Sequence, residues 1–220
     1  MAVRDSGSSG DSKRRRILDA ALEVSQERGV HAARMEEVAA RAQVSKGTLY
    51  RYFENKEDLF LEMIIDSYQL GHRARLALVG AQPKLGPAET LHHLLDGLAK
   101  VLDVVAPRSR VHFQAFGVVG DDPEASARLN QFLAGFHRDR LDEYEELIRA
   151  GQLEGVFRSE TDPAVAAHII LSLLSGFIYR ASFDPAAASP DALQGCFETI
   201  FTEILGFQPV ARPSSEDADA

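Results

Sequence analysis

Apolar residues recur three and four positions apart along most of the chain, a pattern that predicts amphipathic helices. From Pro87 onward no segment alternates convincingly between apolar and polar residues, so we expect no strands there. Glycine and proline are expected to end several helices, at Gly29, at Pro107, and at Gly151 and Gly155. The spacing predicts helices over about residues 13–28, 36–43, 45–53, 56–78, 88–105, 110–119, 124–150, 164–183 and 191–205.

The third predicted helix is short and has two contrasting faces. Ser45 can cap its first free backbone N–H groups, while Leu49 and Phe53 lie four residues apart on one face. Gly47 has no side chain, so a partner can approach the backbone closely. The outer face has no acidic residue, and all its side chains can donate hydrogen bonds: Lys46, Thr48, Tyr50, Arg51 and Tyr52. Such a face suits a polyanion, and a DNA major groove is wide enough to admit this helix.

This helix and its flanks closely resemble the DNA-binding domain of the TetR family of one-component transcriptional regulators. The resemblance extends from roughly Arg14 to Met63. An ordinary helical hairpin with a solvated polar face, the alternative, would not require so many matches at fixed spacing. The matching residues are Glu37-Val38-Ala39, Val44-Ser45-Lys46-Gly47-Thr48-Leu49-Tyr50, Tyr52-Phe53, Asn55-Lys56-Glu57 and Leu59.

The resemblance implies an all-α fold with two domains. A three-helix DNA-binding domain with a helix-turn-helix would occupy residues 12–60, and a helical effector-binding and dimerisation domain would occupy residues 61–207. The long helix from Lys56 would connect the two. The polar segments 1–11 and 208–220 are expected to be disordered tails.

The resemblance also implies which residues contact DNA. Tyr50, Tyr52 and Lys56 match positions that contact the DNA backbone, whereas Ser45, Lys46, Gly47 and Thr48 match the start of the recognition helix. Arg51 occupies a variable position where specificity often resides. Ala33 and Arg34 depart from the family, which commonly has Thr or Ser at both positions. Arg34 can replace a phosphate contact by charge, but we expect the cap of the preceding helix to be weaker.

The charge of the chain is unevenly distributed. Residues 1–60 hold 11 Lys and Arg against 10 Asp and Glu, a net charge of +1, so the overall charge of −9 leaves −10 for residues 61–220. The basic cluster Lys13–Arg16 lies at a helix start, where the helix dipole disfavours cations. We expect phosphate contact by this cluster, and a solvated basic tail is the alternative.

The last two predicted helices are apolar nearly all round, as helices are when they lie centrally or at an interface. The resemblance implies that they form a four-helix bundle with those of a second subunit. Burial in an internal core alone is the alternative. The small residues Ser172, Ser175 and Gly176 permit close helix approach. The candidate interface residues are Ile170, Leu174, Phe177, Phe197, Phe201 and Ile204.

A hydrophobic effector, neutral or singly charged, is expected in the second domain, because ligand sites are mostly apolar with few polar groups. Candidate pocket residues are aromatic or polar side chains at helical spacing, although most aromatic residues on helices form plain core: Tyr68, His72, Phe113, Phe116, Phe132, Phe136 and Tyr179. The seven His are scattered, and His92 and His93 point about 100° apart on a helix, so we expect no metal site. No motif indicates catalysis or a cofactor.

The resemblance to the TetR family, together with these patterns, implies a cytoplasmic, ligand-responsive repressor that binds a palindromic DNA operator as a homodimer. An activator of the same fold remains an alternative, as does, more weakly, a small-molecule-binding protein or enzyme that keeps a relic helix-turn-helix. The single Cys196 excludes an intramolecular disulfide. The N-terminus lacks the apolar core of a secretory signal, and no uninterrupted apolar run is long enough to cross a membrane.

Overall fold

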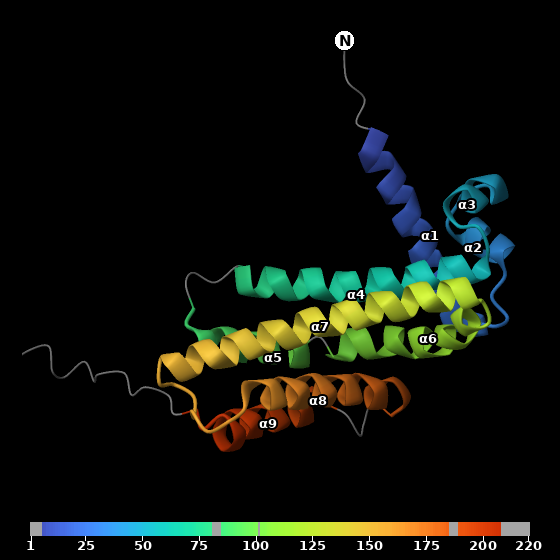
Figure 1. The fold of residues 1–220 in the computed structure, drawn as a ribbon. Coiled ribbons are helices and arrows are strands. Elements are labelled where there is room, and N and C mark those ends of the chain that lie inside the picture. Colours follow the sequence, from blue (N-terminus) through green and yellow to red (C-terminus); the bar gives the residue numbers. More distant parts are fainter. Residues whose placement is uncertain (1–5, 81–84, 101, 185–188, 208–220) are drawn as a thin grey trace, which may run out of the picture.

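The computed structural model describes residues 6–80, 85–100, 102–184 and 189–207 (Figure 1). The elements within these ranges are all helical, which confirms the predicted all-α fold. Residues 1–5 and 208–220 of the two predicted tails lie outside the described residues. The helices are α1 (Ser6–Arg28), α2 (Met35–Arg41), α3 (Lys46–Tyr52), α4 (Lys56–Gly80), α5 (Pro87–Lys100), α6 (Leu102–Gly120), α7 (Pro123–Leu153), α8 (Pro163–Phe183) and α9 (Pro190–Thr199), with a π-helical turn at Ile200–Ile204.

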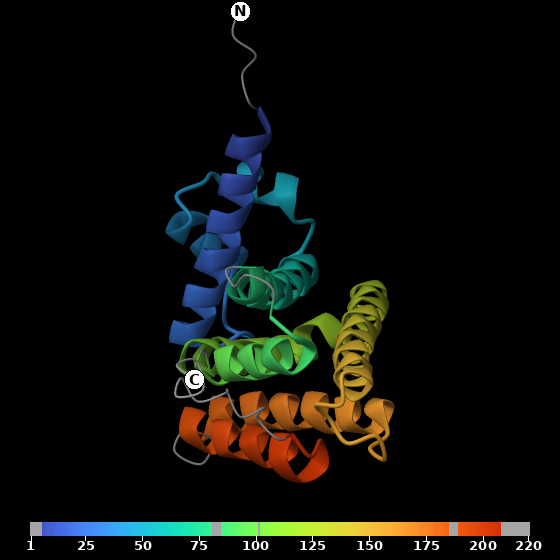
Figure 2. The same ribbon diagram turned by 90° about the vertical axis from the view of Figure 1, so that its left-hand side faces the viewer.

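The helices are arranged in layers below the N-terminal end (Figures 1 and 2). Helices α1, α2 and α3 lie together at one end of α4, and α5 and α6 form the next layer. Helices α8 and α9 are outermost, while α7 runs beside α4 and reaches down to α8. Helix α4 therefore lies between the N-terminal helices and the rest of the protein.

Short polar side chains begin several helices. The Ser45 hydroxyl accepts a hydrogen bond from the Thr48 N–H at 3.1 Å, and Asn55 Oδ1 accepts one from the Asp58 N–H at 2.7 Å, so both predicted caps are confirmed. Asp122 and Asp162 cap α7 and α8, each with a proline in the first turn. Arg34 precedes α2 without a side-chain cap, as its sequence predicts.

Several helix ends differ from the prediction. Helix α5 ends at Lys100 rather than near residue 105. Helix α1 begins at Ser6 rather than near Lys13, because extending an existing helix is much easier than nucleating one. Helix α6 begins at Leu102 and continues through Pro107, which was expected to stop a helix. Proline removes only one backbone hydrogen bond, so the longer helix persists around it. Helix α7 runs past Gly151 to Leu153.

Buried side chains form two clusters that do not follow the chain order. The first joins α1, α2, α3 and the start of α4 to the second half of α6 and the start of α7. The second joins α5, the end of α7, α8, α9 and the π-helical turn. Helix α7 belongs to both, through Leu129 in the first and Tyr144 and Ile148 in the second. The first cluster thus continues across residue 60, where the sequence predicted a domain boundary.

Among the described helices, α8 alone is long and apolar enough to cross a membrane, by length and composition. Its apolar residues do not form an uninterrupted run, because polar residues such as His168 and Ser175 lie among them. In the structure, α8 packs against α6 and α7, and 33% of its apolar window is buried.

Gly151 is required by packing. A Cβ at this position would lie 2.6 Å from Cε2 of Phe157, well inside van der Waals contact. Phe157 is itself buried in the second cluster and lies within ring-contact distance of Phe201 and Phe207. Glycine at this position leaves room for an aromatic ring against the helix. Gly151 therefore serves packing inside α7 and does not mark the end of that helix.

Gly151→Ala should lower the free energy of unfolding by about 1–3 kcal/mol, because the added methyl group overpacks the Phe157 ring. Gly135→Ala is the matched control: it lies on the same helix, and a Cβ there would meet nothing within 4 Å. The control should stabilise by up to about 1 kcal/mol through helix propensity alone. Urea unfolding followed by circular dichroism measures both variants, and stabilisation of both would contradict the packing role.

Candidate nucleic-acid interface

Helices α2 and α3 form a helix-turn-helix held by a small apolar contact. Val38 and Ala39 of α2 and Leu49 of α3 are buried, as predicted, and Phe53 is buried directly after α3. Between the helices, Gln43 adopts a positive φ of 54°, and the Val44 N–H donates to the Ala39 carbonyl at 3.0 Å. This tight turn fixes the direction of α3 relative to α2.

The outer face of α3 is open to solvent. Lys46, Gly47, Tyr50 and Arg51 are exposed, and Thr48 and Tyr52 are half-buried. A Cβ at Gly47 would meet nothing within 4 Å, so the protein's own packing does not require a glycine there. Cations lie over aromatic rings, with Lys46 Nζ 5.7 Å from the Tyr50 ring centroid and Arg51 Cζ 5.6 Å from that of Tyr52. The face thus presents ordered donors around a bare stretch of backbone.

Two lysines near this face have protein partners. Lys46 Nζ donates to Glu36 Oε1 at 2.5 Å, and this contact raises the pKa of Lys46 and lowers that of Glu36. Lys56 Nζ donates to the His31 carbonyl at 2.7 Å and lies over the Phe60 ring, and burial lowers the pKa of Lys56. Each ammonium has three donors, so each keeps donors for a second acceptor. Arg34 is exposed at the start of α2.

The basic cluster Lys13–Arg16 lies inside α1, and its arginines make contacts within the protein. Arg14 pairs with Glu62 and Arg15 with Asp66, while Arg16 Nη2 donates to the Ala42 carbonyl at 2.5 Å. The expected phosphate contact by this cluster is therefore not supported for these three arginines. Because α1 begins at Ser6, these arginines lie beyond its first turn, and the carboxylates of α4 and the Ala42 carbonyl compensate their charges.

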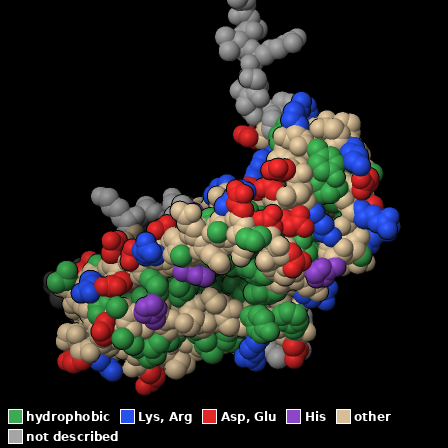
Figure 3. All heavy atoms as spheres, turned by 45° about the vertical axis from the view of Figure 1, so that its right-hand side comes forward, with side chains coloured by type: hydrophobic (Ala, Val, Ile, Leu, Met, Phe, Trp, Pro, Cys, Tyr) green, Lys and Arg blue, Asp and Glu red, His purple; other side chains and the backbone are tan. Residues whose placement is uncertain are grey.

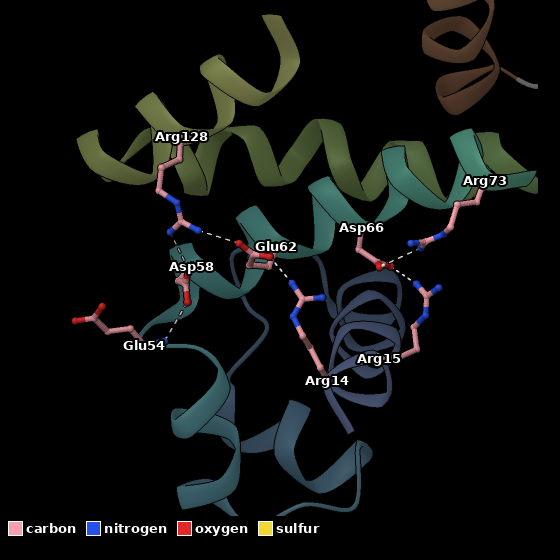
Figure 4. A network of polar contacts seen from close by, with 8 residues as sticks. All are labelled: Arg14, Arg15, Glu54, Asp58, Glu62, Asp66, Arg73 and Arg128. Atoms are coloured by element: carbon pink, nitrogen blue, oxygen red, sulfur yellow. Dashed lines mark hydrogen bonds and ion pairs between the residues drawn. The ribbon is translucent and has the colours of Figure 1, made fainter. Parts of the chain in front are cut away.

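We call Asp58, Glu62 and Asp66, spaced four residues apart on α4, the α4 acidic row (Figure 4). Glu62 pairs with Arg14 of α1 and also accepts from Arg128 of α7 at 2.9 Å. Arg128 reaches Asp58 at 3.1 Å as well. The row therefore ties the N-terminal helices to α7. The regular spacing of the three acids was visible in the sequence, but their partners on α1 and α7 lie 48 to 70 residues away.

The predicted pocket residues gather in two separate groups. Tyr68 and His72 of α4 meet Phe132 and Phe136 of α7, and the Tyr68 and Phe136 ring centroids are 5.1 Å apart. We call these four residues the α4–α7 aromatic group. The other group joins Phe113 and Phe116 of α6 to Tyr179 of α8. Within the described residues, no ring contact connects the two.

Between the groups, His112 of α6 is buried and lies 2.8 Å from the Ser67 hydroxyl of α4. Burial lowers the pKa of His112 to about 4, so the imidazole is neutral at neutral pH. A hollow in another part of the structure, between α5 and α9, is lined by residues that include His92, Asp96 and Glu198. In the described part of the chain, no group of three or more His, Cys, Asp or Glu is placed to hold a metal ion.

Most of the predicted interface residues are internal. Ile170, Phe177, Phe197 and Phe201 are at most 6% exposed and belong to the second buried cluster. Leu174 and Ile204 are half-buried against it. An apolar helix has several faces, and composition alone did not show which one its own chain covers. The exposed large apolar side chains of α8 are instead Val165, Ile169, Tyr179 and Phe183.

Comparison with known proteins matches the N-terminal part of the chain to a protein family. Residues 17–63 match the family described as bacterial regulatory proteins, tetR family. The chain is 29% identical over 174 residues to the transcriptional repressor BepR of Brucella suis, covering 75% of this chain and 78% of that protein. It is 44% identical over 69 residues to the transcriptional activator FasR of Mycolicibacterium smegmatis, covering 30% and 32%.

A similar fold occurs in the transcriptional regulator FadR of Bacillus subtilis, solved in complex with stearoyl-CoA. The TM-score is 0.64 at 21% sequence identity, and the alignment covers 88% of this chain and 99% of that one. At this identity the likeness concerns the fold, which extends through all the helical layers described above.

Lys56→Ala should weaken binding to specific and unspecific DNA by similar factors, because a phosphate contact carries no sequence information. The slope of log affinity against log salt should fall by about one unit. Arg149→Ala is the control, since Arg149 pairs with Glu145 on the exposed surface of α7. Fluorescence anisotropy at four salt concentrations measures the slopes. An unchanged slope for Lys56→Ala would place its ammonium away from DNA.

Proposed function

We infer the function of this chain from the family to which it belongs, the TetR family of bacterial regulatory proteins: it is a DNA-binding transcriptional regulator. Members of this family are regulators rather than enzymes. We propose in addition that it acts in the cytoplasm as a homodimeric repressor on a palindromic operator. A hydrophobic small molecule then releases it from the DNA.

The observation that carries this proposal is the outer face of α3. It presents donors without a single acidic side chain on the helix, and it is exposed at the end of the molecule. Figure 3 shows Lys and Arg side chains along the outer edge of this end. Because phosphates and base edges take hydrogen bonds from such groups, α3 suits the major groove.

The proposed contacts divide into two kinds. Backbone phosphates would take hydrogen bonds from side chains at both ends of the motif: Arg34, Ser45, Thr48, Tyr50, Tyr52 and Lys56. Lys46, Gly47 and Arg51 would lie toward the base edges, with Gly47 allowing the closest approach. On DNA, Lys46 would exchange its Glu36 partner for a phosphate or base. Glu36 then limits unspecific binding, because it competes for the same ammonium.

The DNA-binding interface is compatible with either repression or activation, because the similar proteins include a repressor, BepR, and an activator, FasR. Repression is favoured because the longer alignment is to the repressor and extends into the effector domain. The proposed effector would fit between helices of the second domain, beside the two aromatic groups. An acyl chain is a suitable apolar body, and FadR is an example of this fold with an acyl-CoA bound.

The proposed dimer uses the exposed face of α8. Val165, Ile169, Tyr179 and Phe183 follow one another at helical spacing, and the small residues Ser172 and Gly176 between them are also exposed. Small residues let two helices approach closely, and the apolar side chains on either side would be buried. A second copy on this face would place two α3 helices on one operator.

Selection of random double-stranded DNA by the purified protein tests the function directly. It should return a palindromic sequence, because two identical α3 helices bind equivalent half-sites. Arg51→Ala should change the selected bases while altering unspecific affinity less. If selection with Arg51→Ala returns the same operator, Arg51 does not contact base edges. If wild-type protein enriches no sequence, the proposed regulator function is wrong.

Ile169→Asp should dissociate the dimer, because a carboxylate buried in an apolar interface is strongly unfavourable. Leu153→Asp is the matched control: Leu153 is 90% exposed on α7, so this variant should remain dimeric. Phe201→Asp should instead unfold the protomer, because Phe201 is buried in its own chain. Sedimentation velocity and circular dichroism separate these results. A dimeric Ile169→Asp variant would place the interface elsewhere.

A further inference from the structure

One buried cation in the second half of the protein leaves two of its nitrogen atoms without a hydrogen bond. Arg140 lies on α7, and its side chain is 12% exposed. Its Nη1 lies 2.8 Å from Oε2 of Glu143, a distance that gives an ion pair, but neither Nη1 nor Nε donates a hydrogen bond. Arginine keeps its charge in proteins, so burying these donors unsatisfied costs free energy. An arginine that is retained despite this free-energy cost is expected to have a role other than packing.

The guanidinium lies at the end of the α4–α7 aromatic group. Arg140 Cζ is 5.6 Å from the Phe136 ring centroid. That ring also contacts Tyr68, at 5.1 Å, and Phe132, at 5.9 Å. The arrangement is a row of aromatic rings that leads to one buried positive charge. An amphipathic molecule with an apolar body and an anionic end has the complementary chemistry.

We propose that Arg140 is the anion-binding residue of the effector site, and that the effector is a carboxylate with an apolar body. This inference rests on the proposed effector response. The carboxylate accepts hydrogen bonds from the unsatisfied guanidinium donors, while the apolar body lies against Phe136, Phe132 and Tyr68. A single negative charge fits best, because the guanidinium of Arg140 carries one positive charge and Glu143 already stands beside it.

Matched pairs of small molecules test the charge requirement. The probes are decanoate, hexadecanoate and 4-phenylbutanoate, each with the primary alcohol of the same chain, and stearoyl-CoA as a separate arm. Binding is measured by calorimetry to wild type, Arg140→Gln, Arg140→Lys and Arg149→Gln. Arg149 lies on the same helix, exposed and paired with Glu145, so its variant is the matched control.

At least one carboxylate should bind wild type about 10- to 100-fold more tightly than its alcohol, the range expected for a charge-assisted hydrogen bond. Arg140→Gln should lose this preference and keep the alcohol affinity, whereas Arg149→Gln should keep both. Arg140→Lys should restore part of the preference, since lysine keeps the charge but not the planar fork. Equal affinities for acids and alcohols, no acid binding at millimolar concentration, or binding of stearoyl-CoA alone would each overturn the proposal.

A second measurement does not depend on the choice of ligand. If Arg140 serves a ligand, replacing the pair by Arg140→Met with Glu143→Gln should leave the melting temperature of the free protein unchanged or raise it. A fall of several degrees would show that the pair stabilises the fold, and would overturn the ligand role if the acid preference also persists in Arg140→Gln.

Release of the selected operator separates this inference from the proposed function. Carboxylates that bind through Arg140 without changing operator affinity would support the site and contradict the effector response. Acids and alcohols that release DNA equally, from wild type and Arg140→Gln alike, would support the effector response and overturn the role of Arg140.

Discussion

The start of α4 is buried over most of its circumference, and the rest of the structure depends on this. Leu59, Phe60, Leu61, Met63 and Ile64 are each at most 3% exposed. Because residues along a helix point about 100° apart, these five buried positions cover more than half of the circumference, and Glu62 occupies the remaining side. One side meets the helix-turn-helix, and the other meets α6 and the start of α7. The recognition helix is thus oriented by a core that it shares with the second half of the protein.

Glu62 is the only polar residue inside this apolar run, and it lies at the centre of the ionic contacts. Its carboxylate is 20% exposed and joins Arg14 of α1 to Arg128 of α7. Partly exposed ion pairs contribute at most about 1 kcal/mol each, so these contacts add little to stability. These ion pairs matter more for which helices they join than for the free energy they contribute. A shift of α7 on effector binding would pull on the same carboxylate that positions α1, which gives a physical route from the aromatic groups to the DNA-binding helices.

The DNA-binding motif could be predicted from the sequence because its determinants are local. The Ser45 cap, the Asn55 cap and the burial of Leu49 and Phe53 all involve residues within a few positions of one another. The α8 and α9 faces could not be predicted, because apolar residues surround both helices and only the fold selects the covered side. The same applies to Arg14, whose partner Glu62 is 48 residues away. Gly151 was misassigned because the ring that requires it belongs to the following loop.

The helix-turn-helix and the second half of the protein share one core, so we expect them to open together. Native-state hydrogen exchange of the full chain in low denaturant measures this directly. The amides of Ile17–Val24 in α1, of Leu59–Ile64 in α4 and of Val111–Val119 in α6 should merge into one unfolding isotherm. If α1 to α3 exchange through a separate opening of lower free energy while Val111–Val119 stay protected, the two parts are independent and the account is contradicted.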